Sequence, residues 1–206
     1  STTRRREDNA NLLFQANQEL TSDITLDATL GGNIRYEQNE TVSANGTDFI
    51  LPNLLTLGNT RGDQQGGGYG FSEKQVNSVF GSARFNYRDY LYLEVTGRND
   101  WSSTLPETNN SYFYPSVNSS FIFTEVVDGL PEVLSTGTLR AAWGRVGADT
   151  NPYQLNVTYG LVGSHPAKGG GSVARGSLTQ TTIPPLDLKP EQKETIEFGT
   201  NLQFFD

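Results

Sequence analysis

The feature that most constrains this chain is the strict alternation of apolar and polar side chains over residues 24–37. One parity is apolar except for Gly32, and the other parity has no apolar side chain. Successive side chains of a strand point to opposite faces, so the pattern predicts a strand with one apolar and one polar face. Strands of soluble proteins are usually about 5–6 residues long, whereas a membrane-crossing strand needs about 9–11. The length therefore favours a membrane-crossing strand.

Composition agrees with that interpretation. Only 34% of the 206 residues are hydrophobic, and 22 Gly and nine Pro interrupt the chain. This is little for a water-soluble core but typical of a transmembrane barrel, whose inner face is polar. No run approaches the roughly 18 apolar residues of a membrane helix. Because hydrocarbon offers no partner to backbone groups, strands can cross it only as a closed barrel. The sequence predicts an all-β fold, an antiparallel transmembrane β-barrel segment.

Seven strands are predicted, at about 9–20, 24–37, 79–87, 91–98, 116–123, 139–143 and 196–204. Three-residue turns at 21–23 and 88–90 and a compact link at 125–137, with one helical turn at 130–134, alternate with loops at 38–75, 99–113 and 147–190. Strands that run up and down place every second connection on the same side. The pattern therefore predicts short periplasmic turns and long extracellular loops, the asymmetry of outer-membrane barrels.

The turns also predict the register of two hairpins, because a shift of one residue would exchange the two faces. The predicted pairs are Leu20–Ile24, Ala16–Ala28 and Phe14–Leu30 in the first hairpin, and Tyr87–Leu91, Phe85–Leu93 and Arg84–Glu94 in the second.

The alternation assigns the candidate site residues to faces. The residues predicted to face lipid are Leu26, Leu30, Ile34, Phe85, Leu93, Val95, Phe121, Ile196, Phe198 and Leu202. The polar residues predicted to face the lumen are Arg84, Glu94, Arg98 and Glu197. The aromatic residues predicted to form interfacial girdles are Tyr87, Tyr90, Tyr112, Phe113 and Tyr114, and sugar stacking is the alternative for the last three.

Seven strands do not make a complete bacterial barrel, where the strand number is even, and an open sheet would leave two unpaired edges in lipid. The chain also has no methionine, even at position 1, and no signal peptide. We therefore expect residues 1–206 to be a fragment of a longer barrel.

Several motifs in order along the chain carry a family resemblance. The run from Gly97 to Ser103 reads GRNDWSS, Tyr112 to Ser116 reads YFYPS, and Leu139 to Gly144 reads LRAAWG. The stretches 186–191, 197–199 and 49–59 fit the same series. Together they resemble the SusC/RagA family of TonB-linked (TonB-dependent) outer-membrane transporters of Bacteroidota. The resemblance implies a barrel of about 22 strands, with a plug domain, a TonB box and further strands that this chain lacks.

The resemblance also implies partners and activity. The partners are a SusD-like surface lipoprotein, TonB acting through the missing plug, and outer-membrane lipid and lipopolysaccharide. The assembly could be a dimer of transporter–lipoprotein pairs. The predicted function is a part of the barrel wall of a transporter that imports oligosaccharides or oligopeptides, with the long loops 38–75 and 147–190 meeting substrate or lipoprotein. The alternatives are a siderophore or vitamin receptor without a lipoprotein lid, and a secreted β-rich adhesin or carbohydrate-binding module.

Other chemistry is predicted to be absent. There is no cysteine and one histidine, His165, in the longest predicted loop, so no catalytic base, metal site or cofactor is expected. Asp100 and Glu107 could bind calcium but lack regularly spaced oxygen ligands. The Gly clusters at 66–68 and 169–171 are interpreted as loops and not as phosphate cradles. A net charge of −8 argues against nucleic acid.

Arg4, Arg5 and Arg6 precede the first predicted strand on the loop side. One hypothesis is that they bind lipopolysaccharide phosphates, since Arg binds phosphate in a bidentate manner. The alternative is a solvated loop end.

Overall fold

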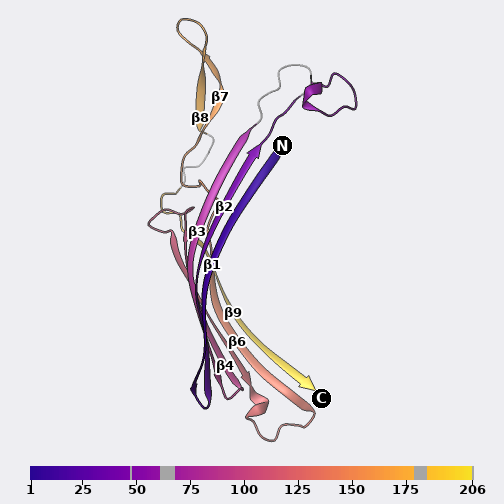
Figure 1. Cartoon of the computed structure of the whole chain (residues 1–206), viewed down its shortest axis with the longest axis vertical. Coiled ribbons are helices and arrows are strands. Elements are labelled where there is room, and N and C mark those ends of the chain that lie inside the picture. The colour runs from indigo at the N-terminus through magenta and orange to yellow at the C-terminus, as the bar shows by residue number, and fades with distance from the viewer. Residues whose placement is uncertain (47, 61–67, 179–184, 206) are drawn as a thin grey trace.

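The computed structural model describes residues 1–206 except 47, 61–67, 179–184 and 206. Seven strands form one antiparallel sheet, in the order β1-β2-β3-β4-β5-β6-β9 (Figure 1). They are β1 (Thr2–Thr21), β2 (Ile24–Val42), β3 (Tyr69–Tyr87), β4 (Leu91–Ser102), β5 (Ser111–Ile122), β6 (Leu134–Ala148) and β9 (Glu191–Phe204). In the described part of the chain, no helix has the length and hydropathy to cross a membrane.

The sheet is a tall, curved wall with its connections divided between two ends (Figure 1). The loop-side end carries the short helix η1 (Leu57–Asn59) and a separate hairpin formed by β7 (Tyr159–Pro166) and β8 (Ser172–Leu178). The turn-side end carries the two tight turns and the short helix η2 (Phe123–Glu125). The predicted fold, an antiparallel barrel segment with short turns at one end and long loops at the other, is confirmed.

The register of the second predicted hairpin is confirmed at Tyr87–Leu91, Phe85–Leu93 and Arg84–Glu94. In the first hairpin Ala16–Ala28 and Phe14–Leu30 are confirmed, but the predicted pair Leu20–Ile24 is wrong. Thr21 pairs with Ile24, and the register shifts between Glu19 and Thr21. Two-residue loops are the favoured hairpin connection, and a bulge takes up the extra residue without changing the faces further along the strand.

Most strands extend beyond the predicted bounds towards the loop side. β2 and β3 continue to Val42 and back to Tyr69, so the predicted loop 38–75 shrinks to residues 43–68. The predicted loop 99–113 likewise shrinks to 103–110, because β4 ends at Ser102 and β5 begins at Ser111. The cause is physical: above the lipid the outer face no longer has to be apolar, so alternation fades although the backbone ladder continues.

Three further predictions are wrong. The helical turn predicted at 130–134 lies at Phe123–Glu125. The short strand predicted at 139–143 is the 15-residue strand β6. The stretch 147–190 is not irregular throughout, because β7 and β8 pair within it. The hairpin strands have no consistent apolar face, since a structure in water needs none, and periodicity therefore missed them.

The wall has almost no core of its own. Among the described residues only Val76, Leu105 and Tyr112 are buried hydrophobic side chains. Along the outer face, by contrast, Leu30, Leu93 and Phe198 are 57%, 40% and 83% exposed. A soluble domain would bury these side chains, because each large apolar side chain gains about 1.5–3 kcal/mol on burial. The exposed apolar face fits contact with lipid.

The first three strands are taller than the apolar band. On the outer face of β2 the band runs from Ile24 to Ile34, and Tyr36 follows. Residues 37–42 then continue the ladder, paired with residues 2–7 of β1 and 69–74 of β3. At about 3.3 Å per residue and a typical barrel tilt, this collar rises roughly 15–20 Å above the band.

Candidate functional site: the polar face of the wall

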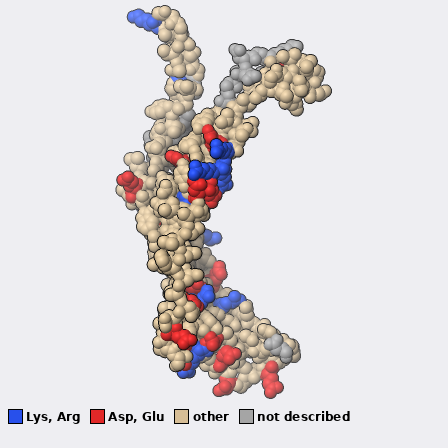
Figure 2. Space-filling view, in the orientation of Figure 1, with Lys and Arg blue, Asp and Glu red and all other residues tan. Residues whose placement is uncertain are grey.

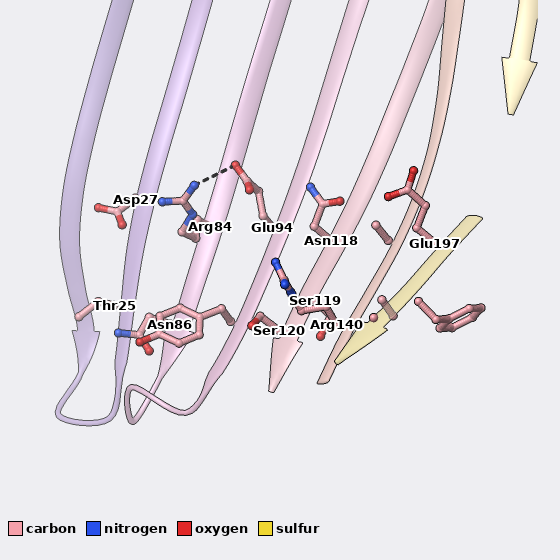
Figure 3. A pocket seen from close by; sticks show the side chains of 15 residues that line it. Thr25, Asp27, Arg84, Asn86, Glu94, Asn118, Ser119, Ser120, Arg140 and Glu197 are labelled. Carbon is pink, nitrogen blue, oxygen red and sulfur yellow. Dashed lines mark hydrogen bonds and ion pairs between the residues drawn. The ribbon is translucent and has the colours of Figure 1, made fainter. Parts of the chain in front are cut away.

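The polar face of the sheet carries a charged hollow near its turn-side end. This hollow has a volume of about 750 Å³ and is lined by residues of several neighbouring strands, among them Asp27, Arg84, Glu94, Arg140 and Glu197 (Figure 3). Paired strand residues share a face, so the ladder pairs Asp27–Arg84–Glu94–Asn118 run across one surface. Three of the four residues predicted to face the lumen, Arg84, Glu94 and Glu197, therefore lie in one hollow.

The charges of this turn-side hollow are only loosely paired. Arg84 Nη2 lies 3.4 Å from Glu94 Oε1, with side chains 53% and 30% exposed. Asn17 donates to Asp27 Oδ1 at 2.6 Å, and Arg140 donates to Asn201 Oδ1 at 2.5 Å. Ion pairs this exposed contribute little to stability. The arrangement suits contact with a polar protein surface or with water.

Arg98, the fourth predicted lumen residue, lies in a tighter network nearer the loop side. Its Nε donates to Asp100 Oδ1 at 2.7 Å and to Tyr114 Oη at 3.1 Å, and its Nη2 donates to Ser78 Oγ at 2.8 Å. The guanidinium also lies 5.6 Å from the centre of the Phe80 ring. Asp100 is buried and additionally accepts a hydrogen bond from the Tyr114 hydroxyl. Arg98 therefore links β3, β4 and β5 through hydrogen bonds, and both carboxylate oxygens of Asp100 accept hydrogen bonds from Arg98 or Tyr114.

The prediction that Tyr112, Phe113 and Tyr114 together form an interfacial girdle is wrong for two of them. Tyr112 and Tyr114 pair with Asp100 and Arg98 and so lie on the polar face, where Tyr112 is 7% exposed. Only Phe113 lies on the outer face, where it is 56% exposed. Consecutive strand residues alternate faces, so the parity of this strand was enough to separate them.

The other aromatic pair, Tyr87 and Tyr90, lies at the turn side. The two rings meet edge to face with centres 5.4 Å apart, and Tyr90 meets Phe121 in the same way at 6.1 Å. Such pairs are favourable beyond the area they bury. The neighbouring Arg88 donates to Asp23 of the first turn at 2.9 Å. This hydrogen bond lowers the pKa of Asp23, outside the membrane-spanning strands.

A second cluster, which sequence analysis did not predict, is formed by Lys74, Ser102, Thr104 and Asp149 and is named here the Asp149 cluster. Lys74 Nζ lies 2.6 Å from Asp149 Oδ1, and their side chains are 18% and 12% exposed. Ser102 donates to Asp149 Oδ2 at 2.5 Å and contacts the Thr104 hydroxyl at 2.9 Å. Pairing between β5 and β6 ends at Ser116–Gly144, and the chain just after β6 then contacts β3 and β4. Only tertiary structure brings residues 75 positions apart together.

A group of three asparagines on the polar face was also missed. Asn33 Nδ2 donates to Asn9 Oδ1 at 2.5 Å, to Asn11 Oδ1 at 2.7 Å and to the Ala10 carbonyl at 3.2 Å. These three, named here the amide triplet, line a second hollow of about 510 Å³ together with Arg35, Arg98, Tyr112 and residues 147–149. Asn, Asp and Arg alternate freely at polar positions, so no periodic signal marked them.

The predicted position of the three N-terminal arginines is also wrong. Arg4, Arg5 and Arg6 do not precede the first strand but lie within β1, opposite Glu40, Asn39 and Gln38. Arg6 pairs with Asp8 at 2.7 Å and Arg5 with Glu7 at 3.5 Å. Acidic and basic side chains are interleaved near the loop-side ends of the first strands (Figure 2). A phosphate site built on all three arginines would have to compete with these carboxylates.

The remaining candidates of the sequence lie in connections. His165 is in β7, opposite Val173. Glu107 is exposed in the loop 103–110. Gly169, Gly170 and Gly171 lie between β7 and β8 and adopt positive φ, whereas Gly66 and Gly67 lie outside the described residues. Within the described part of the chain no group of three or more His, Cys, Asp or Glu side chains could hold a metal ion.

Fold and face chemistry together define a class: a stretch of transmembrane β-barrel wall, with an apolar face for lipid and a polar face for the lumen. Comparison with protein families shows which barrel family the chain belongs to. The whole chain, residues 1–206, matches the TonB dependent receptor-like, beta-barrel family, and the chain belongs to it. This agrees with the predicted resemblance to SusC/RagA transporters, and it places the barrel in the bacterial outer membrane.

Solved structures support the fold. The chain is similar to the structure of the RagAB peptide transporter, with 17% identity and a TM-score of 0.80, over 98% of this chain and 22% of that one. The RagAB peptide importer in the 'open-open' state gives 18% identity and a TM-score of 0.78 over the same shares. The chain thus spans about a fifth of the solved chains it matches. No curated protein matches it.

Proposed function

We propose that this chain is part of the barrel wall of a TonB-driven outer-membrane transporter that imports oligopeptides or oligosaccharides together with a SusD-like surface lipoprotein. The observation that carries the proposal is the two-sided wall: apolar side chains such as Leu30 remain exposed on one face, and hydrogen-bonded polar groups cover the other. A membrane barrel whose lumen holds polar contents has this division. Membership of the TonB-dependent receptor barrel family supports the energy source.

The turn-side hollow has a part in this proposal. Its charges alternate in sign from Asp27 and Arg84 to Glu94 and Arg140, and the one ion pair among them, Arg84–Glu94, is partly exposed. A folded plug inside the barrel would offer complementary polar groups to them. We therefore assign Arg84, Glu94 and Glu197 to plug contact, and substrate contact to the loop-side half of the wall.

The proposed substrate and the proposed lipoprotein lid are supported by the similar solved structures. Those structures are described as RagAB, a peptide transporter or importer in 'closed-closed' and 'open-open' states. The collar and the β7–β8 hairpin of this chain would be the parts of the wall that meet such a lid.

The test uses the full-length transporter in its own bacterium. Deleting its gene should abolish uptake of a labelled oligopeptide or oligosaccharide mixture, and deleting TonB should have the same effect. A lipid-anchored protein should co-purify with the barrel in detergent, and the size of the complex distinguishes one transporter–lipoprotein pair from two. Uptake of an iron chelate or a vitamin by the transporter, with no lipoprotein co-purifying, would favour a siderophore or vitamin receptor. Solubility without detergent would favour the adhesin or binding module, and either result contradicts the proposal.

A further inference from the structure

The ladder between β5 and β6 ends before either strand does. In the described part of the chain the two strands pair only as far as Ser116–Gly144. β5 continues along β4 to Ser111, and β6 continues along β9 to Ala148. The last apolar residue of outward parity in β6 is Trp143. The wall therefore divides into two sheets at the upper edge of the apolar band, and each sheet has an edge at the division.

The residue at which the ladder stops cannot donate to it. Ile122 N donates to the Tyr90 carbonyl, so the even-numbered residues of β5 direct their backbone groups to β4. Backbone groups alternate between the two sides of a strand, and the odd-numbered residues therefore direct theirs to β6. The first of these beyond Ser116 is Pro115, which has no N–H. Proline is confined to strand edges for this reason, so the sequence itself favours an edge at this point.

Beyond the division, residues 145–148 of β6 and 191–194 of β9 stay paired and form a unit named here the inner flap. A Cβ on Gly147 would lie 2.9 Å from Tyr112 Cδ2, so the flap passes over the Tyr112 ring. Tyr112 projects from the inner face of β5, whereas Gly147 has the outward parity of Trp143. The outward side of the flap therefore lies against the inner side of β5, and a side chain larger than glycine would push it away.

Asp149 holds the end of the inner flap in this position. Its carboxylate lies 2.6 Å from Lys74 Nζ and accepts from Ser102 Oγ at 2.5 Å. Lys74 belongs to β3 and Ser102 to β4, so the chain has crossed the inner side of β5. A little further on, the hydroxyl of Tyr153 accepts from Glu73 N at 3.3 Å. The flap is thus attached to the wall by side chains and not by the ladder.

The two edges left by the division are complementary. Continuing the register of the ladder would place Phe113 opposite Gly147 and Ser111 opposite Asp149. Both β5 residues are odd-numbered, so their backbone groups already point to the β6 side, and an unpaired backbone group costs free energy. The same flap therefore has a second position, beside β5 in the ladder, in which these groups are paired and the contact with Lys74 is lost.

We infer that the inner flap is a gate built into the barrel wall, with two positions. In the inward position the Asp149 cluster holds it over β5 and β4, and it narrows the lumen below the mouth. In the other position it joins the ladder of β5, and the lumen is wider. This inference rests on the proposed function, because it makes the flap a regulator of the import route.

The first test measures the position of the flap in the purified full-length transporter in lipid nanodiscs. Nitroxide labels are attached at Ala148→Cys on the flap and Phe71→Cys on β3, both exposed positions. The intact cluster should give one short distance. Asp149→Ala should add a population longer by roughly 10 Å, two strand spacings. Asp8→Ala, which removes an exposed ion pair with Arg6, is the control and should leave the single short distance.

The second test uses cross-linking to show where the released flap goes. Asp149→Cys removes the carboxylate, and its thiol then reports its neighbours. With Ser102→Cys it should form the disulfide of the inward position. With Ser111→Cys it should form the disulfide of the ladder position, because directly opposite residues lie within disulfide reach. Phe113→Cys is two residues out of register and is the control, which should cross-link poorly.

The third test relates the flap to uptake in cells. The disulfide between residues 102 and 149 should stop TonB-dependent uptake of a labelled oligopeptide and oligosaccharide mixture, and a reductant should restore it. The disulfide between residues 111 and 149 should leave uptake intact.

Each of the following results would overturn the inference: a distance distribution in Asp149→Ala that matches the Asp8→Ala control, equal cross-linking at Ser111→Cys and Phe113→Cys, or full uptake with the flap locked inward. If the Asp149 variants yield too little folded barrel, the labelled pair with the intact cluster still decides, because a distance that spans the three strand spacings from β3 to β6 contradicts the inward position. Absence of any TonB-dependent uptake by the unaltered transporter refutes the proposed function, and the distances and cross-links then test the flap alone.

Discussion

Lys74 and Asp149 meet across the inner wall, with the ammonium nitrogen 2.6 Å from a carboxylate oxygen. The two residues are on different sides of β4 and β5 in the sheet order, and both side chains are more than four-fifths buried. Ser102 completes the contact from β4. This relationship fixes the start of the segment that carries the β7–β8 hairpin.

Asp149→Ala is expected to loosen that segment, because the Lys74 ammonium would remain shielded from water without its partner. The cost in unfolding free energy should be about 1–3 kcal/mol. Limited proteolysis of the folded barrel should show faster cleavage between residues 149 and 190. Asp8→Ala serves as the control, since its ion pair with Arg6 is more than half exposed on both sides and should contribute little. Equal protease sensitivity in the two variants would refute the role of the Asp149 cluster.

Placing arginine at Leu30 tests the assignment of faces. Leu30 is near the middle of the apolar band and 57% exposed, so its replacement should cost roughly 2–4 kcal/mol. Thr29→Arg puts the same charge on the polar face and should be far milder. The measurement is the yield of heat-modifiable folded barrel and its unfolding midpoint in urea. Comparable losses at the two positions would contradict the assigned faces.

Gly137 tests how the turn-side link is packed. A Cβ at this position would lie 2.6 Å from Phe123 Cε1, closer than two carbon atoms can approach. Gly137→Ala should therefore displace the Phe123 ring and cost about 1–3 kcal/mol. Phe123→Ala should remove most of the additional penalty, so that the double variant is no less stable than Phe123→Ala alone. A double-mutant cycle in urea measures this coupling, and strictly additive losses would show that the ring does not limit Gly137.

The ion pair between Asp23 and Arg88 is expected to make the stability of the fold depend on pH. The hydrogen bond from Arg88 lowers the pKa of Asp23 below its ordinary value of 3.8. A carboxyl group whose pKa is lowered by folding stabilises the fold above its unfolded pKa, and this contribution is lost as the pH falls through the folded pKa. Asp23→Asn should thus lower the urea midpoint at pH 7, and this deficit should shrink as the pH falls to 2. Glu107→Gln, at an exposed loop position, is the control. A deficit in Asp23→Asn that is the same at both pH values would refute the linkage.

The parts of the fold that alternation specifies could be predicted, and the rest could not. Between Ile24 and Ile34, lipid imposes period two on the outer face, so the strand and its faces followed from the residues, as did the pairs Ala16–Ala28 and Phe14–Leu30. The pair at Ile24 did not, because a bulge beside the turn shifts the register there. Beyond Tyr36 no such constraint acts, and the collar was read as loop. The Arg84–Glu94 pair was foreseen because a turn fixes its register. Asp149 and Asn33 were not, because their contacts depend on how distant strands curve together.

The overhang of β1, β2 and β3 also changes the electrostatics at the mouth. Charged headgroups act through water over a screening length of about 8 Å at physiological salt, and the collar places the rim roughly 15–20 Å above the apolar band. A molecule arriving at the rim therefore meets the protein's own Arg, Asp and Glu first, while the field of the headgroups reaches it weakened by screening. Capture at that height should respond to salt chiefly through those side chains.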